Sequence, residues 1–179
     1  MTSLNAVYAL EHLSVLILDE NLHMRHLIRE ILLALGIRDT SLVSNVPQAF
    51  KELRHFTADI IITDWHLEPL DGFEFVKLVR TALDNRNPFV PIIMLSAGTE
   101  AKYLQNARDA GVNEFLAKPV SAKSLYQRIL SLIDHPRKFL KTKNYVGPDR
   151  RRHDDGPAIG KSERRSVMPE TNNTEARSV

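Results

Sequence analysis

The chain has 179 residues, of which 43% are hydrophobic and 26% are charged, as is typical of a globular protein. It contains no cysteine, which excludes disulfides and thiolate metal sites. Its apolar runs fall short of the roughly eighteen residues of a membrane span, so we predict no transmembrane segment. Residues 1–11 lack the basic start and apolar stretch of a signal peptide, and we therefore expect a cytoplasmic protein.

The net charge of +2 is unevenly distributed along the chain. From Arg137 onward there are eleven Lys or Arg against six Asp or Glu, whereas the rest of the chain has thirteen against sixteen. The composition predicts an N-terminal segment over residues 1–11, a mildly acidic domain over residues 12–135 and a basic tail over residues 136–179.

In the first half of the chain, short apolar runs alternate with helical patterns. Residues 13–18 read LSVLIL and predict a buried strand, and residues 22–35 repeat apolar side chains at the spacing of an amphipathic helix. Residues 41–44 predict a short second strand, and residues 46–53 a second helix. Residues 58–63 carry three consecutive isoleucines and predict a third, buried strand.

The same alternation continues in the second half. A helix is expected from residue 72 toward residue 83, followed by a fourth strand over residues 90–95. Residues 100–110 predict a weaker helix, residues 112–116 a fifth strand, and residues 121–133 a helix capped by its first serine. Five strand and helix pairs in this order predict an α/β fold with a five-stranded parallel sheet and helices on both faces.

Polar side chains follow four of the predicted strands. Asp19 and Glu20 follow the first strand, Asp64 the third, Ser96 the fourth and Lys118 the fifth. Because the carboxyl ends of parallel strands meet at one edge of the sheet, we expect these groups to form one site. Three carboxylates require a cation, and oxygen ligands favour Mg²⁺. The set suits phosphoryl transfer to a carboxylate that a lysine, a hydroxyl and a metal ion assist.

Four segments, in order, carry a resemblance to a known family. They read LILDEN, IIITDWHLEPLDGFE, PIIMLSAGTE and EFLAKPVSAKSL. In this order and spacing the chain from Leu13 to about Asp134 resembles the receiver domain of two-component response regulators, especially the single-domain chemotaxis type. The resemblance implies a flavodoxin-like fold with strand order 2-1-3-4-5, an order for which a chemotaxis receiver is itself a standard example.

The resemblance also implies a role for each matched residue in phosphoryl transfer. It makes Asp64 the phosphoacceptor, and it makes Asp19, Glu20, Asp64 and the backbone carbonyl of His66 the ligands of Mg²⁺. It makes Lys118 the phosphate-binding lysine. Glu20 stands where the family most often has Asp.

Two further residues match the positions that signal phosphorylation in this family. The resemblance makes Ser96 the hydroxyl switch residue and Phe115 the aromatic switch residue, at a position where tyrosine is common. It also implies a cis peptide bond before Pro119, which places Lys118.

The function that follows from the resemblance is signalling in a two-component phosphorelay. A histidine kinase or phosphotransfer protein would donate the phosphoryl group to Asp64, and the face built by the fourth helix, fifth strand and fifth helix would then bind a protein target. On this interpretation the protein is a phosphoacceptor, with at most autophosphatase activity, and not a conventional enzyme. A phosphatase resembling the haloacid dehalogenases is the enzymatic alternative, with His66 at the position of that family's general acid.

The tail leaves several interpretations open. It suits a solvated linker that is largely disordered, although four of its residues could pack locally: Phe139, Leu140, Tyr145 and Val146. Two arginine clusters suit phosphate recognition: Arg150, Arg151, Arg152, Arg164 and Arg165. The first cluster resembles the Arg-rich extensions of some receivers that bind cyclic di-GMP, and contact with nucleic acid or an anionic membrane is a further alternative. The composition does not predict a typical DNA-binding domain.

Overall fold

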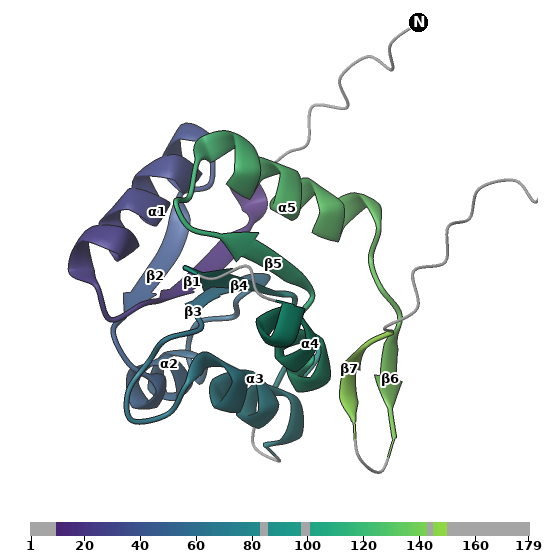
Figure 1. The fold of residues 1–179 in the computed structure, drawn as a ribbon. Helices are drawn as coiled ribbons and strands as arrows, with labels where there is room; N and C mark the ends of the chain where they lie inside the picture. Colours follow the sequence, from purple (N-terminus) through teal and green to yellow (C-terminus); the bar gives the residue numbers. More distant parts are fainter. Residues whose placement is uncertain (1–9, 83–85, 98–100, 143–144, 150–179) are drawn as a thin grey trace, which may run out of the picture.

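A computed structural model describes residues 10–82, 86–97, 101–142 and 145–149. Its centre is a five-stranded parallel sheet in the order β2-β1-β3-β4-β5 (Figure 1). The strands are β1 (Ser14–Leu18), β2 (Asp39–Val43), β3 (Ile60–Asp64), β4 (Ile92–Ser96) and β5 (Glu114–Ala117). This arrangement confirms the predicted fold class and strand order.

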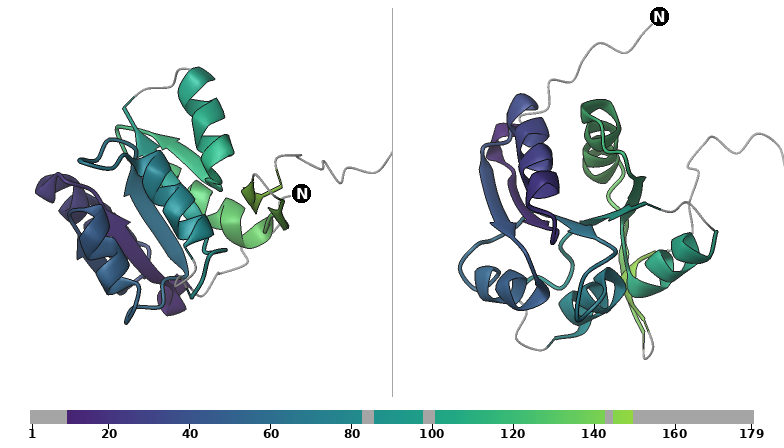
Figure 2. Two further views of the ribbon diagram at one scale, coloured as in Figure 1. Left: turned by 90° about the horizontal axis from the view of Figure 1, so that it is seen from below. Right: turned by 60° about the vertical axis from the view of Figure 1, so that its left-hand side comes forward.

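Helices cover both faces of the sheet. They are α1 (Leu22–Ala34), α2 (Val46–Glu52), α3 (Gly72–Thr81), α4 (Ala101–Ala110) and α5 (Ala122–Asp134), and a short 3-10 helix, η1 (Leu10–His12), precedes β1. Helices α1 and α5 lie on one face, and α2, α3 and α4 lie on the other (Figures 1 and 2). None of the helices in the described part of the chain has the length and apolar character needed to span a membrane.

Each face of the sheet has its own apolar layer. Under α1 and α5, Ile28 and Ile129 pack with residues of β1 and β3 that point to that side. On the opposite side, Phe75 and Val79 of α3 pack with residues of the same strands that point the other way. Every residue of β3 and β4 is buried, as expected for central strands covered on both faces.

The register of the strands brings their carboxyl ends to one edge of the sheet. Asp64 is the last residue of β3 and pairs with Leu95, and Ser96 is the last residue of β4 and pairs with Ala117. The predicted strand over residues 58–63 is therefore displaced by one or two residues, because pairing with β4 extends β3 to Asp64. The acid is part of the sheet, which limits its freedom more than a loop would.

The helices that follow β1, β3 and β5 begin at well-formed caps. The Asn21 side chain accepts hydrogen bonds from the first turn of α1. Asp71 and Glu74 form a capping box at the start of α3, and Ser121 and Ser124 form another at the start of α5. These caps fix where each helix begins, and therefore fix the loops that lie between strand end and helix.

Beyond α5 the structure departs from the predicted boundary at residue 135. Strands β6 (Phe139–Lys141) and β7 (Val146–Pro148) form an antiparallel hairpin within a segment that we expected to be largely disordered. The hairpin contains Phe139, Leu140 and Val146, three of the four residues that we expected to be able to pack locally. Gly147 and Pro148 are buried, so the hairpin packs on the domain. Strands of three residues are too short to show a hydrophobic period, which explains why the sequence pattern did not predict them.

Candidate functional site

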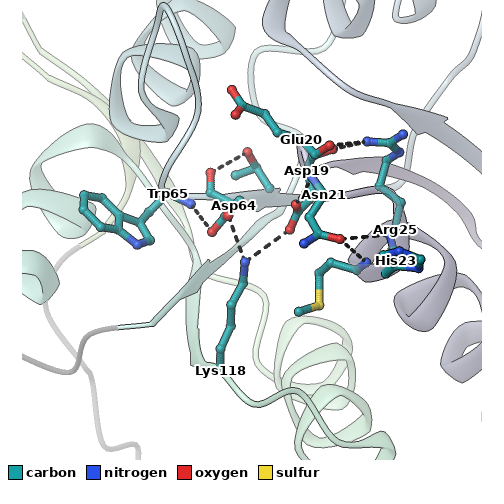
Figure 3. Close-up of polar contacts among 10 residues, drawn as sticks. Asp19, Glu20, Asn21, His23, Arg25, Asp64, Trp65 and Lys118 are labelled. Atoms are coloured by element: carbon teal, nitrogen blue, oxygen red, sulfur yellow. Dashed lines mark hydrogen bonds and ion pairs between the residues drawn. The ribbon is translucent and has the colours of Figure 1, made fainter.

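The sheet edge formed by the strand ends gathers most of the predicted site residues. Asp19 directly follows β1, Asp64 ends β3, Ser96 ends β4 and Lys118 directly follows β5. Asp19, Asp64 and Ser96 are buried, with relative exposures of 1%, 8% and 1%. Asp19, Asp64 and Lys118 point toward one another (Figure 3). The alternation of strands and helices brings polar side chains from four segments, distant in the sequence, to this edge.

Lys118 joins the two buried carboxylates. Its Nζ lies 2.8 Å from Asp64 Oδ2 and 3.2 Å from Asp19 Oδ2. The other oxygen of each carboxylate accepts a backbone hydrogen bond, from Trp65 N to Asp64 Oδ1 at 2.9 Å and from Asn21 N to Asp19 Oδ1 at 2.8 Å. Both carboxylates are therefore held in a fixed orientation, with one ammonium group shared between two negative charges (Figure 3).

The protonation of this pair is shaped by burial and by the shared charge. Burial raises the pKa of Asp64 above its usual value, and the neighbouring charge of Asp19 raises it further, although Lys118 opposes both. For Lys118, burial alone would lower the pKa, but Asp64 and Asp19 outweigh it and leave the pKa raised. Lys118 is accordingly a permanent cation at neutral pH, in a site that still has an excess of negative charge.

Backbone contacts set the position of Lys118 and of the loop after β3. Lys118 N donates to Ser96 O at 2.7 Å, and the peptide bond before Pro119 is cis, as the resemblance implied. At the start of α3, Gly72 N donates to Trp65 O at 2.8 Å. A Cβ on Gly72 would lie 2.8 Å from Trp65 Cα, so this close approach of helix and strand end requires glycine.

The structure does not bring the Glu20 carboxylate to the other two acids. Glu20 is exposed, and its Oε1 accepts a hydrogen bond from the backbone of Glu68 in the loop between β3 and α3. Figure 3 shows its side chain directed away from Lys118. Among the residues that the structure describes, no three His, Cys, Asp or Glu side chains are arranged to hold a metal ion.

Arg25 on α1 is a residue at this site that the sequence did not single out. Its Nη1 donates to Asp19 O at 2.5 Å and to Glu20 O at 3.0 Å. The guanidinium therefore fixes the backbone of the loop that carries both acids. No motif signals this contact, because a helical arginine one turn into α1 has the pattern of an ordinary exposed residue.

The remaining predicted residues lie around this edge. The His66 side chain is exposed, next to the half-buried Trp65, whose ring centroid lies 5.5 Å from that of His66 and 6.4 Å from that of Phe73. Phe115, in β5, is half-buried and packs against the apolar layer under α3 and α4. The tail arginines at positions 150–152, 164 and 165 lie outside the described residues.

Comparison with known proteins identifies related domains. Residues 15–130 match the family described as response regulator receiver domain. The chemotaxis protein CheY of Pseudomonas aeruginosa is 28% identical over 122 residues, which cover 68% of this chain and 97% of that protein.

Solved structures show the same similarity. The chemotaxis response regulator CheY4 of Vibrio cholerae is 26% identical with a TM-score of 0.61, covering 67% of this chain and 98% of that one. The receiver domain of sensor histidine kinase PA1611 from Pseudomonas aeruginosa is 34% identical with a TM-score of 0.58, covering 66% of this chain and 94% of that domain. That structure holds a magnesium ion in its active site cleft.

Proposed function

Because the chain belongs to the response regulator receiver domain family and acts in two-component phosphorelay signalling, we propose that Asp64 is the residue that accepts the phosphoryl group. The observation that supports this most directly is a buried carboxylate at the end of a central strand with the Lys118 ammonium 2.8 Å away. The same Nζ lies 3.2 Å from Asp19, so the lysine already bridges the acid expected to react and the acid expected to bind metal.

The residues present fit Mg²⁺ by the chemistry of their donors. The carboxylates of Asp19 and Asp64 are oxygen ligands, the loop carbonyl at His66 is a further one, and Glu20 would join by leaving its bond to Glu68. The burial and mutual repulsion that raise the pKa of Asp64 favour an additional cation. When bound, Mg²⁺ would supply charge neutralisation for the transferring phosphoryl oxygens.

In the proposed reaction one oxygen of Asp64 forms a bond to phosphorus as the bond between phosphorus and the donor imidazole nitrogen breaks. The electron pair of the broken bond stays on the imidazole, and the product is an acyl phosphate. Lys118 neutralises charge on the phosphoryl oxygens. To reach them, its ammonium group releases its hydrogen bond to the Asp64 carboxylate. The hydroxyl of Ser96, at the end of the adjacent strand, donates to a phosphoryl oxygen.

Signal output follows from the same geometry. Ser96 ends β4, and Phe115 lies on the adjacent strand β5, where it pairs with Met94 and its ring packs against the apolar layer under α4. If the Ser96 hydroxyl moves toward the phosphoryl group, the space available to the Phe115 ring changes. This change would favour a conformation of α4, β5 and α5 that binds a protein target.

Labelling with acetyl phosphate, a small phosphodonor, tests the proposal. Wild type should gain one phosphoryl group in the presence of Mg²⁺ and none with a chelator, and Asp64→Asn should gain none. Asp59→Asn is the matched control, because Asp59 directly precedes the opposite end of the same strand and its amide retains an acceptor for Ser14 N. Equal labelling of wild type and Asp64→Asn would remove the proposal.

A further inference from the structure

Arg80, in the last turn of α3, is a buried guanidinium whose hydrogen bonds hold three segments together. It is 3% exposed. Nε and Nη2 donate to Gly111 O at 3.2 and 3.0 Å, and Nη1 donates to Pro88 O at 2.8 Å and Val90 O at 2.7 Å. The fifth donor bonds to Asn113 Oδ1 at 3.0 Å. Arg80 thus ties α3 to the segment before β4 and to the junction between α4 and β5.

The C-terminal hairpin closes over this guanidinium. Arg80 Cζ lies 5.1 Å from the centroid of the Phe139 ring, a cation–π contact. Phe139 also packs edge to face on Phe89, with ring centroids 5.2 Å apart. Burial lowers the pKa of Arg80 to about 10, with Tyr145 opposing the change, so the side chain is charged at neutral pH. The aromatic cover therefore faces a cation that has almost no exposed surface to hydrate.

A second contact brings the backbone of the hairpin against the junction between α4 and β5. Gly111 has a φ of +98°, and a Cβ on it would lie 2.9 Å from Val146 O. A Cβ on Gly147 would lie 2.8 Å from Gly111 Cα and 2.6 Å from Tyr145 Oη. Both positions require glycine because main chain meets main chain. Residues 139–148 lie beyond the segment that matches the receiver family, so this contact is an addition to the family domain.

We propose that the β6–β7 hairpin is a clamp on the junction between α4 and β5, and that its docking is coupled to phosphorylation of Asp64. The coupling rests on the proposed function, in which α4 and β5 change position with the state of Asp64. If the two states place Gly111 differently, they bind the hairpin with different affinity, and hairpin docking must then bias phosphorylation in return. The docked hairpin would therefore link the chain beyond residue 149 to the conformation of α4 and β5.

Hydrogen exchange in the full chain tests the clamp. Phe139→Ala removes the ring over Arg80, whereas Leu140→Ala alters an exposed side chain of the same strand and is the control. We expect Phe139→Ala to speed exchange about tenfold at the hairpin amides of Thr142 and Asp149, and also at Val112, whose amide bonds to α4. The clamp is overturned if the hairpin amides exchange faster while the exchange rate of Val112 stays the same. It is also overturned if none of these rates changes.

Two further measurements keep the test decisive. If Phe139→Ala speeds exchange throughout β3, the whole domain has opened and this variant does not isolate the hairpin. The test then uses Phe139→Leu, which keeps apolar volume without a ring, and measures exchange at the same amides of Thr142, Asp149 and Val112. For the coupling, exchange of wild type is compared before and after acetyl phosphate and Mg²⁺, with acyl phosphate measured in the same sample. We expect phosphorylation to change the exchange rate of the Asp149 amide about fivefold.

The outcomes separate the clamp from the proposed function. Unchanged hairpin exchange in a sample that contains acyl phosphate overturns the coupling alone. Absence of acyl phosphate removes the proposed function and the coupling that rests on it, while the clamp still stands or falls by the exchange of Val112.

Discussion

Removing the positive charge of Lys118 should destabilise the fold through its two carboxylate partners. The substitution Lys118→Met keeps the stem volume and removes an ammonium that lies 2.8 and 3.2 Å from Asp64 and Asp19. Breaking a buried ion pair costs about 3–5 kcal/mol. The Lys118 side chain is 19% exposed, so we expect a loss of about 2–3 kcal/mol in the free energy of unfolding. Lys123→Met, at an exposed position early in α5, should change it by less than about 0.5 kcal/mol.

Urea unfolding followed by the fluorescence of Trp65, the single tryptophan, measures this loss. If charge is the cause, adding Asp64→Asn to Lys118→Met should restore more than half of it, because only one uncompensated carboxylate then remains. A double variant as unstable as Lys118→Met alone would show that the loss comes from packing, and would refute the electrostatic explanation.

The pH dependence gives a second check on Lys118. Its pKa is raised in the folded protein, so its contribution to stability is complete below the ordinary lysine pKa and is lost as the pH rises through the raised value. The free energy of unfolding of wild type should therefore fall more steeply with rising alkaline pH than that of Lys118→Met. Identical alkaline slopes for the two proteins would contradict the raised pKa.

Substitutions at Asp64, Gly72 and Arg80 each change one contact described above. Asp64→Asn should be more stable than wild type at pH 7 by about 1 kcal/mol in thermal unfolding. The raised pKa of Asp64 means that its ionised form is disfavoured in the fold, so this gain should vanish as the pH falls below the ordinary Asp pKa; a constant gain would contradict it. Gly72→Ala should lower stability by about 2 kcal/mol or more, because its Cβ would lie 2.8 Å from Trp65 Cα, and an unchanged melting temperature would disprove the close approach. Arg80→Met should cost about 3 kcal/mol in urea unfolding, since it leaves buried carbonyls without donors, and a neutral effect would show that water replaces the guanidinium.

The sequence predicted the sheet and the strand ends because both depend on local pattern. Consecutive β-branched residues before Asp64 indicated a buried strand and the apolar run before Ser96 a further one, and a parallel sheet brings the carboxyl ends of such strands to one edge. The residue types at those ends also predicted phosphoryl chemistry, and that part stays a prediction. Strand boundaries were displaced where pairing with a neighbour, which no local pattern encodes, extended β3 to Asp64.

Features that depend on side-chain direction or on distant contacts were not predictable. The Glu20 side chain turns to the loop after β3, and the partners of Arg25 are backbone carbonyls across a loop. Arginine is usually an exposed residue type, whereas Arg80 lies on the buried side of α3, and the groups that cover it, among them Gly111 and Phe139, are distant in the sequence. These contacts arise from tertiary packing, which overrides the local preference of the residue.

The central claim is that Asp64 carries the phosphoryl group, and peptide mapping tests it most directly. The full chain is incubated with acetyl phosphate and Mg²⁺, the acyl phosphate is reduced with borohydride, and the modified residue is located by mass spectrometry. We predict reduction of Asp64 to homoserine, dependent on Mg²⁺ and absent when the metal is chelated. Modification at Asp19 or elsewhere, or no modification under conditions in which the protein is folded, would contradict the claim.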